Sequence, residues 1–409
     1  MTNRMDEDIE HINLIMEYTK ASREISPERL LLGSNNVPAK LRARVALQLA
    51  LQGKFSHKLP SWASLSCYIP SRLALEQCSS EEVANYKKRF INLDDTLADL
   101  TGGMGVDFWA LESVSEQPSY YVELQPELIQ AARYNLSRLS SSPRRFLQAN
   151  AEKIIPQLIE SGVTFFYIDP ARREGIDKGK QYHRQYSIED CKPNVSELLQ
   201  HLPQDGSIRL LAKLSPMLDL SDTLNKLTFI SQLHIVAQKG EVKELLALIE
   251  PGVSLPTEEI PIIVSDVSSG LHFTFCLAQE KTSRALIADQ PLSYLYLPHS
   301  GIMKAGCHRF LCQKYEVYKL HPNSHLYSSE KAVSDFPGKS FRIARIIPYH
   351  HKEVKALTQS LPAANLVSRN FPLSPLELRK KLKIREAESP YLVATTLSDG
   401  SLVLIEAIG

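Results

Sequence analysis

The stretch Thr96–Leu97–Ala98–Asp99–Leu100–Thr101–Gly102–Gly103–Met104–Gly105–Val106–Asp107 decides the fold of this chain. It predicts a buried strand over residues 96–100 that ends in an acid, a turn through glycines, and a helix from about residue 106. Glycines at such a turn permit positive φ and let a ligand lie against bare backbone, while the helix N-terminus offers free amides. The stretch therefore predicts a nucleotide-binding turn in an α/β sheet, with an ordinary tight turn as the alternative.

A second acid indicates which kind of nucleotide the turn would take. The next predicted strand, residues 119–122, is followed by Glu123, about twenty residues beyond the glycines, where a carboxylate can accept from both ribose hydroxyls. A dinucleotide fingerprint would need a third glycine where Phe108 stands. A P-loop would need a Gly-Lys-Ser/Thr sequence, and no lysine lies near the turn. Both of these nucleotide sites are therefore disfavoured.

Composition is that of an ordinary globular protein of more than one domain. The chain has 409 residues, of which 43% are hydrophobic and 23% charged, and Lys+Arg 47 against Asp+Glu 46 leaves a formal net charge of +1. This length predicts two to four domains. Because the global charge is near zero, any surface that binds nucleic acid must be a local one.

The sequence favours a cytoplasmic protein with no membrane-spanning segment. Residues 1–8 are polar and acidic, unlike a signal peptide, and no apolar run is long enough to cross a bilayer. The six cysteines are scattered without a C-x-x-C pair, which favours reduced thiols. Cys307, His308 and Cys312 could form half of a metal site, but no second half follows, so we expect buried thiols and no metal.

Along the chain, the patterns predict four regions. We expect a helical region over residues 1–90, and an α/β domain over 91–284 in which strands and helices alternate around a seven-stranded, Rossmann-like sheet. Two small α+β domains are expected over 285–340 and 341–409. The expected strands of the sheet are residues 96–100, 119–122, 146–148, 164–168, 207–214, 233–237 and 271–278, with residues 242–248 as the last covering helix.

Polar residues follow several of these strands and should meet at one edge of the sheet. Asp99 to Gly105, Glu123, Asn150 with Ala151, and Asp169 with Pro170 all come directly after a predicted strand. Asn150 could hydrogen-bond an adenine amino group, or it could cap the helix that starts at residue 151; the sequence leaves both open. This combination resembles motif I and the ribose-binding acid of class I S-adenosylmethionine (SAM)-dependent methyltransferases.

The residues Asp169–Pro170–Ala171–Arg172–Arg173 form the tip of an apolar strand. They resemble motif IV of the methyltransferases that modify exocyclic amines of bases, usually Asp/Asn-Pro-Pro followed by an aromatic residue that stacks on the base. Here Ala171 replaces the second proline and Arg172 replaces the aromatic. Arg172 and Arg173 could instead grip a phosphate or stack a guanidinium on a base.

Two neighbouring features could also contact the molecule that accepts the methyl group. Residues 172–186 mix basic and aromatic side chains, a composition that suits an RNA backbone or, alternatively, a solvated charged loop. Lys213 ends a buried apolar strand, where a lysine is unusual, and is expected to contact an anionic acceptor or Asp169. Ser79, Glu81, Tyr86 and Lys87 could reach the ligand edge, but we expect them to form a helix cap and a solvated face. For Glu241, Lys243 and Glu244 we expect charges at a helix N-terminus.

Taken together, residues 99–107, the Asp169 tip, Lys213–Pro216, Gly240–Glu244 and Ser374–Arg379 resemble one family: bacterial class I methyltransferases with ferredoxin-like and THUMP-like C-terminal domains. The resemblance implies SAM as cofactor, bound by Asp99, Thr101, Gly103, Gly105, Glu123, Asn150, Ala151 and Asp169. It implies a catalytic group of Asp169, Pro170, Arg172 and Lys213. THUMP domains bind RNA, so by analogy RNA is the expected substrate, contacted by Arg172, Arg173, Lys213, and by Arg379 and Lys380 of a basic helix.

Three hypotheses about function remain open from the sequence. The first is a SAM-dependent methyltransferase of RNA, with a base amine as the favoured acceptor. The second keeps SAM but makes the acceptor a protein or a small molecule. The third is a non-catalytic RNA-binding protein whose methyltransferase fold has decayed, which the altered Asp169 tip would favour.

Overall fold

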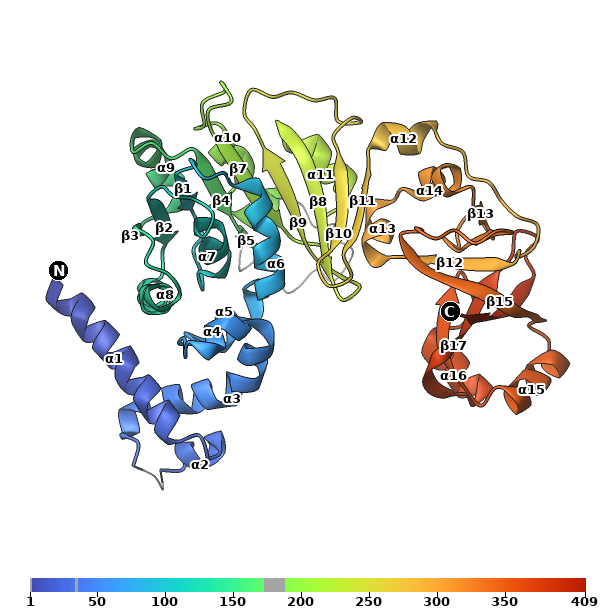
Figure 1. Cartoon of the computed structure of the whole chain (residues 1–409), viewed down its shortest axis with the longest axis horizontal. Helices are drawn as coiled ribbons and strands as arrows, with labels where there is room; N and C mark the ends of the chain where they lie inside the picture. The colour runs from blue at the N-terminus through green and yellow to red at the C-terminus, as the bar shows by residue number, and fades with distance from the viewer. Residues whose placement is uncertain (1, 34–35, 173–187) are drawn as a thin grey trace. The chain divides into compact units, whose positions relative to one another are not determined.

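The computed structural model of the chain describes residues 2–33, 36–172 and 188–409, which form two compact units. The first unit consists of residues Met1–Gln238 and Lys243–Leu255, and the second of Lys239–Val242 and Pro256–Gly409. Figure 1 shows the elements of both units in chain order from blue to red. Each unit is described by itself.

The N-terminal ninety residues are helical, as the sequence predicts. The helices are α1 (Thr2–Ala21), α2 (Pro27–Leu31), α3 (Arg42–Lys58), α4 (Pro60–Ser64), α5 (Arg72–Gln77) and α6 (Glu81–Tyr86), with 3₁₀ turns at Ala39–Leu41 and Lys87–Phe90. Ile12, Leu30 and Val45 are buried here together with Ala131 and Tyr134 of a later helix. The N-terminal helices therefore share a core with the α/β part of the first unit.

The first unit is built on a mostly parallel sheet. Its strands are β1 (Leu97–Asp99), β2 (Ser119–Glu123), β3 (Arg144–Gln148), β4 (Phe165–Ile168), β7 (Arg209–Leu214), β8 (Ile230–Gln238) and β9 (Glu241–Ile249), in the order β3-β2-β1-β4-β7-β9-β8. Strands β3, β2, β1, β4 and β7 run parallel, and β9 runs antiparallel to β7. The α/β class with a Rossmann-like sheet is thereby confirmed.

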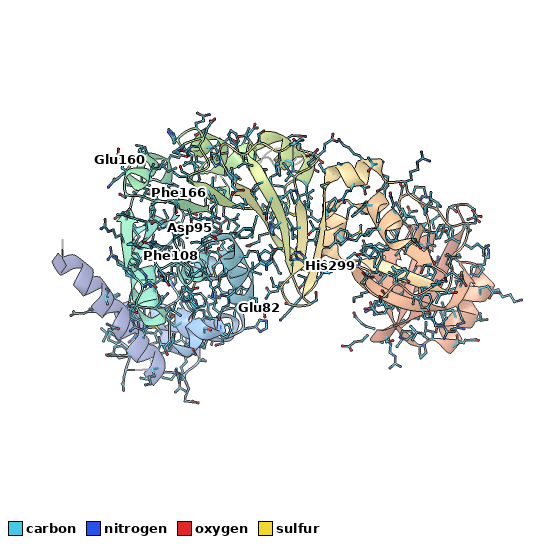
Figure 2. The ribbon with its side chains drawn as sticks, turned by 45° about the horizontal axis from the view of Figure 1, so that its top comes forward. Glu82, Asp95, Phe108, Glu160, Phe166 and His299 are labelled. Carbon is cyan, nitrogen blue, oxygen red and sulfur yellow. The ribbon has the colours of Figure 1, made fainter. Side chains whose placement is uncertain are left out.

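Within the described residues, the strands are connected by helices α7 (Val106–Glu112), α8 (Pro126–Leu139), α9 (Ala151–Glu160), α10 (Val195–Leu199) and α11 (Leu220–Lys226). α7 packs against β1, and α8 packs against β2 and β3. Figure 2 labels Phe108 of α7 and Phe166 of β4, two fully buried rings of this core. The bulky ring at position 108 lies inside the core, where its edge meets Tyr121 of β2 at a centroid distance of 5.5 Å.

Two predictions about the sheet are wrong. The sheet has nine strands, of which the first unit contains the seven given above, and not seven in all. Residues 242–248 form strand β9 and not a covering helix. Lys239 and Gly240, both with positive φ, make a two-residue connection from β8, and so short a connection joins antiparallel strands. The apolar run from Leu245 to Ile249 is buried on both faces, and that pattern does not distinguish a strand from a buried helix in the sequence.

The second unit contains the antiparallel pair β10 (Ile262–Asp266) and β11 (Leu271–Phe275), and helix α12 (Leu277–Thr282). A seven-stranded sheet follows, in the order β13-β14-β12-β15-β18-β17-β16. Its strands are β12 (Tyr294–Pro298), β13 (Tyr318–Lys319), β14 (Tyr327–Ser329), β15 (Gly338–Pro348), β16 (Ala363–Arg369), β17 (Arg385–Thr396) and β18 (Leu402–Ile408). Its helices are α13 (Ser300–Ala305), α14 (His308–Tyr315), α15 (His351–Ser360) and α16 (Pro375–Leu382).

Strand β15 joins the two small C-terminal regions into one sheet, because it pairs with β12 on one side and with β18 on the other. One hydrophobic cluster likewise combines Leu295 and Leu326 with Val393 and Ile405. The capping box at the start of α16 is formed as the sequence predicts, with Ser374 and Glu377 bonding reciprocally. The domain bounds at residues 284 and 340 remain predictions.

In the described part of the chain, no helix is both long enough and apolar enough to cross a membrane.

Candidate active site

The glycine turn after β1 has the backbone that its sequence predicts. Gly103 has φ +56° and Gly105, which precedes α7, has φ +87°. At Gly102 a Cβ atom would lie 2.3 Å from the ring of Tyr121, so only glycine fits between the turn and β2. The Tyr121 hydroxyl donates to the carbonyl of Gly103 at 2.6 Å. The turn is therefore fixed at the carboxyl end of β1, where Gly103 is half-buried and Gly102 and Gly105 are buried.

Glu123, the predicted ribose acid, lies directly beside this turn. Its Oε2 accepts from the backbone N–H of Gly103 at 3.0 Å, and its Oε1 accepts from those of Leu124 at 2.7 Å and Gln125 at 2.9 Å. Three amides therefore orient one half-buried carboxylate at the sheet edge. A carboxylate held in this way is ready to accept from a pair of vicinal hydroxyls.

Asp99 and Thr101 link the ends of β1 and β4. Asp99 Oδ1 accepts from the backbone N–H of Thr101 at 2.9 Å, and Thr101 Oγ1 accepts from the backbone N–H of Asp169 at 2.7 Å. Asp99 is 1% exposed, and this burial raises its pKa well above the usual value. The glycine turn and the Asp169 tip are thus held together by hydrogen bonds.

Asn150 caps α9, one of the two roles that the sequence leaves open. Its Oδ1 accepts from the backbone N–H of Glu152 at 2.9 Å and of Lys153 at 3.2 Å. Ala151 is the first, buried residue of this helix. The contact of Asn150 with adenine remains a prediction.

Lys213 contacts Asp169 directly. The Nζ atom of Lys213 lies 2.6 Å from Asp169 Oδ2, and the two side chains are 13% and 40% exposed. The ammonium is therefore enclosed, whereas the carboxylate of Asp169, with Pro170 after it, opens outward. The backbone of Arg172 pairs with Cys191 in the short ladder of β5 (Ala171–Arg172) and β6 (Cys191–Lys192). Arg173 and the basic-aromatic residues up to 186 lie outside the described residues.

Beneath this contact lies a cluster of buried polar side chains that the sequence analysis does not assign to the site. Asp107, in the first turn of α7, lies at its centre. Its Oδ1 is 2.9 Å from Lys87 Nζ, and its Oδ2 accepts from the hydroxyls of Tyr167 at 2.8 Å and Ser79 at 3.0 Å. Lys87 Nζ also lies 2.6 Å from Glu244 Oε1. Lys213 Nζ is 3.8 Å from Asp107 Oδ2, so this cluster reaches the Asp169 contact.

The expectations for Ser79, Tyr86, Lys87 and Glu244 are wrong. Tyr86 is 6% exposed and so does not lie on a solvated face. Lys87 is 0% exposed and belongs to no solvated face, and Glu244 lies on β9 and not at a helix N-terminus. Ser79 is buried and bonds Asp107, while the N-cap of α6 is Ser80. Lys87 stands next to Lys88 in the sequence, and Glu244 next to Lys243, so neither position indicates burial. Their partners come from distant parts of the chain.

The pKa values in the cluster depend on two opposing effects, which are burial and the charges of neighbouring side chains. Burial would lower the pKa of Lys213, but Asp169, Asp107 and Glu244 outweigh it and raise that pKa, so Lys213 remains an ammonium. Burial would also raise the pKa of Asp107, but Lys87 and Lys213 hold it below the usual value. For Glu244 the effect of burial prevails, and its pKa is raised.

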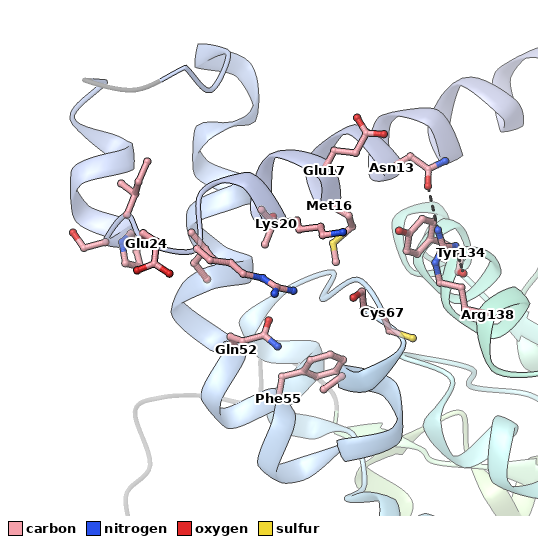
Figure 3. Close-up of a pocket in the computed structure, with 18 residues that line it drawn as sticks. Asn13, Met16, Glu17, Lys20, Glu24, Gln52, Phe55, Cys67, Tyr134 and Arg138 are labelled. Atoms are coloured by element: carbon pink, nitrogen blue, oxygen red, sulfur yellow. Dashed lines mark hydrogen bonds between the residues drawn. The ribbon is translucent and has the colours of Figure 1, made fainter.

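A pocket of ≈ 1010 Å³ lies in the helical N-terminal region. It is lined by 18 residues, including Met16, Lys20, Phe55 and Tyr134, and none of them is a predicted site residue (Figure 3).

Among residues 2–33, 36–172 and 188–409, no three or more His, Cys, Asp or Glu side chains lie together in a group that could bind a metal ion. The six cysteines are free thiols.

The predicted RNA contacts Arg379 and Lys380 lie on α16 in the second unit. Lys380 is exposed, whereas Arg379 faces Glu386 with Nη1 3.5 Å from its carboxylate. Lys381 lies 5.1 Å from the ring centroid of Tyr349. The helix thus presents cations to solvent in a chain that is otherwise close to neutral.

Three family models match parts of the chain. Residues 7–51 match an "N-terminal domain in putative methyltransferase", residues 294–337 a "ferredoxin-like domain", and residues 338–407 a "THUMP domain-like" model.

Similar proteins match almost the whole chain. A crystal structure described as a "putative methyltransferase from Porphyromonas gingivalis W83" is 38% identical, covers 98% of each chain and superposes with a TM-score of 0.88. An uncharacterized S-adenosylmethionine-dependent methyltransferase of Mycobacterium tuberculosis is 21% identical over 357 residues, which are 87% of this chain and 92% of that protein.

Proposed function

The chain belongs to the family of SAM-dependent methyltransferases with ferredoxin-like and THUMP-like C-terminal domains, and from that premise we propose that it methylates RNA at an amine nitrogen of a base. The observation that carries the proposal is the Asp169 carboxylate, held by Lys213 at the carboxyl end of β4 and bonded through its backbone to Thr101 of the glycine turn.

The residues of the glycine edge fit SAM. Gly103 leaves the turn without a side chain beside the Glu123 carboxylate, which can receive the ribose hydroxyls, whereas Gly105 is buried against α8 and β2. Asn150 would contact the adenine, and the methionine part would lie beside Thr101. The amides of Thr101, Gly102, Gly103 and Gly105 already donate within the protein, so they hold the turn and not the ligand. SAM, when bound, supplies a methyl group that its sulfonium already activates.

Asp169 and Pro170 would orient the acceptor. Lys213 occupies Oδ2 of Asp169, so the other carboxylate oxygen is the one to accept a hydrogen bond from an amine N–H. The rigid turn at Pro170 fixes the direction of the neighbouring backbone carbonyl. Methyl transfer from an activated sulfonium requires mainly such orientation of a neutral nucleophile for in-line attack. Arg172 and Arg173 would then hold a phosphate or another base of the same RNA molecule.

The choice of RNA is supported by the second unit. Residues 338–407 match a THUMP-like model, and THUMP domains bind RNA. Although the whole chain has a net charge of only +1, the cations of α16 form a local surface that could contact phosphates. A protein or small-molecule acceptor is the second candidate, because Asp169 could accept a hydrogen bond from any amine that reaches it and Lys213 could pair with any anion.

Transfer of label from methyl-labelled SAM to total cellular RNA tests the proposal. We expect the wild-type chain to label RNA, and Asp169→Asn to reduce the rate at least ~10²-fold, a larger loss than any fall in SAM affinity, since Asp169 orients the amine as well as lining the SAM site. Label in the protein or small-molecule fraction would support the second candidate. No labelled RNA with intact SAM binding would overturn the RNA proposal.

A further inference from the structure

The cluster below the Asp169 contact contains a lysine that touches neither the glycine turn nor the acceptor edge. Lys87 Nζ lies between Asp107 Oδ1 at 2.9 Å and Glu244 Oε1 at 2.6 Å, and it donates to Ser79 Oγ at 3.2 Å. Its side chain is 0% exposed. Burying an ammonium is costly, and two carboxylates and a hydroxyl around it offset that cost.

Lys213 has two carboxylates within reach, and the structure shows which one it bonds. Its Nζ lies 2.6 Å from Asp169 Oδ2 and 3.8 Å from Asp107 Oδ2. Asp107 is the more deeply buried of the two, with 10% of its side chain exposed against 40% for Asp169. The attraction between charges grows as water is excluded, so an Asp107 without another cation would draw Lys213 inward.

Lys87 removes this competition. It neutralises Asp107 from the side opposite the site, while the hydroxyls of Tyr167 and Ser79 satisfy Oδ2. We propose that Lys87 is a positioning residue for the acceptor side of the site: by holding Asp107, it leaves the ammonium of Lys213 to Asp169. The role given to Asp169 rests on the proposed function, whereas the choice of Lys213 between two carboxylates does not.

Removal of the Lys87 charge tests the inference. In Lys87→Met we expect Lys213 to move to Asp107, the methylation rate of total cellular RNA to fall at least ~10-fold, and SAM affinity to change less than about twofold. The second substitution in Lys87→Met/Asp107→Asn removes the competing charge, and its carbonyl oxygen can still accept from Tyr167 and Ser79. We therefore expect this double variant to recover the rate to within about threefold of wild type.

Arg144→Met is the matched control. It removes a buried cation from another buried carboxylate of the first unit, Glu112, whose Oε1 lies 2.7 Å from Arg144 Nη2. We expect it to lower the melting temperature without changing the rate at 25 °C. Lys87→Gln, whose amide can donate to Asp107 or Glu244, carries the same expectation as Lys87→Met if the methionine variant does not fold.

Crystal structures of the Lys87 variants provide a readout that needs no acceptor. Lys213 within hydrogen-bonding distance of Asp107, and away from Asp169, supports the inference even if no RNA is labelled, in which case only the proposed function fails. Lys213 still on Asp169 in the single variant overturns the inference. If the wild type labels RNA, a double variant no more active than the single one overturns it too.

Discussion

At the scale of single residues, Glu123 shows how local sequence places a functional group. It is the last residue of β2, and the amides of Gly103, Leu124 and Gln125 all donate to it. Two of these donors follow it in the chain, so most of its orientation is local. The third couples it to the glycine turn, which forms only when β1 and β2 pair.

Replacing Glu123 should weaken the binding of SAM. Glu123→Ala removes the acceptor for the ribose hydroxyls, and hydrogen bonds to a charged group contribute about 1.5–3 kcal/mol each, so we expect SAM affinity to fall at least ~10-fold in isothermal calorimetry. Glu127→Ala is the control, because that exposed carboxylate on α8 makes a surface ion pair of little energetic weight. Equal affinities in the wild type and the Glu123 variant would exclude this role.

The positions of the strand-end residues could be predicted, because the sequence shows where each strand ends and indicates that the strands are parallel. Asp99, Glu123 and Asp169 each follow a continuous apolar run, and parallel strands bring their carboxyl ends to one edge. The cluster of Ser79, Lys87, Asp107, Tyr167 and Glu244 could not be predicted in the same way. Its members come from four separate elements and the loop before α6, and charges in solvated faces and in buried pairs look alike in a sequence.

At the scale of elements, α7 is fixed at both ends by buried polar contacts. Asp107 in its first turn bonds Lys87, Ser79 and Tyr167, and Glu112 at its last position pairs with Arg144 of β3. Burial raises the pKa of Glu112 although Arg144 opposes it. This short helix therefore depends on distant partners more than on its own seven residues.

Breaking the Arg144–Glu112 pair should destabilise the first unit. Arg144→Met leaves a carboxylate buried without its cation, and we expect a loss of about 3–5 kcal/mol in the free energy of unfolding. In Arg144→Met/Glu112→Met no buried charge is left, and most of that loss should be recovered. Urea unfolding followed by tryptophan fluorescence measures the effect, because Trp62 and Trp109 both belong to the first unit. A double variant as unstable as the single one would contradict the prediction.

Strand β9 shows where prediction of elements fails. Residues 242–248 have a spacing that a helix would also satisfy, and the decision in favour of a strand comes from hydrogen bonding to β7 along Leu245–Ile249. That pairing is long-range, so no window of local sequence contains it. The strand also carries Glu244 into the core beside Lys87. Because a helix was expected over residues 242–248, Glu244 could not be recognised as a member of the buried cluster.

At the scale of the whole molecule, the second unit carries a local basic surface. The exposed cations Lys380 and Lys381 lie on α16, next to Arg379. Binding of single-stranded RNA through phosphate contacts should weaken steeply as salt rises. A small-molecule acceptor would show little of this dependence.

Neutralising the α16 cations should reduce the salt dependence of RNA binding. For Lys380→Gln/Lys381→Gln we expect the slope of log K against log salt to decrease in magnitude by about 0.7 for each phosphate that the helix no longer neutralises, as measured by filter binding of total cellular RNA. Lys20→Gln/Lys40→Gln, which alters two exposed lysines of the N-terminal helices, makes the same change in net charge and should leave the slope unchanged. A slope that changes equally in both variants would indicate general charge attraction without a docking surface on α16.

Local sequence was sufficient to predict the α/β class, the glycine turn with its flanking acids, the capped helix at Pro375 and the resemblance to a methyltransferase family. These features depend on residues close in the chain: apolar periodicity, glycines that permit positive φ, and caps within one helical turn. The pairing of Lys213 with Asp169, the contact of Lys87 with Asp107 and the strand over residues 241–249 follow only from the folded chain. Ion pairs and strand pairs join residues that are far apart in the chain, and their partners are selected by burial and distance, which exist only after the chain has folded.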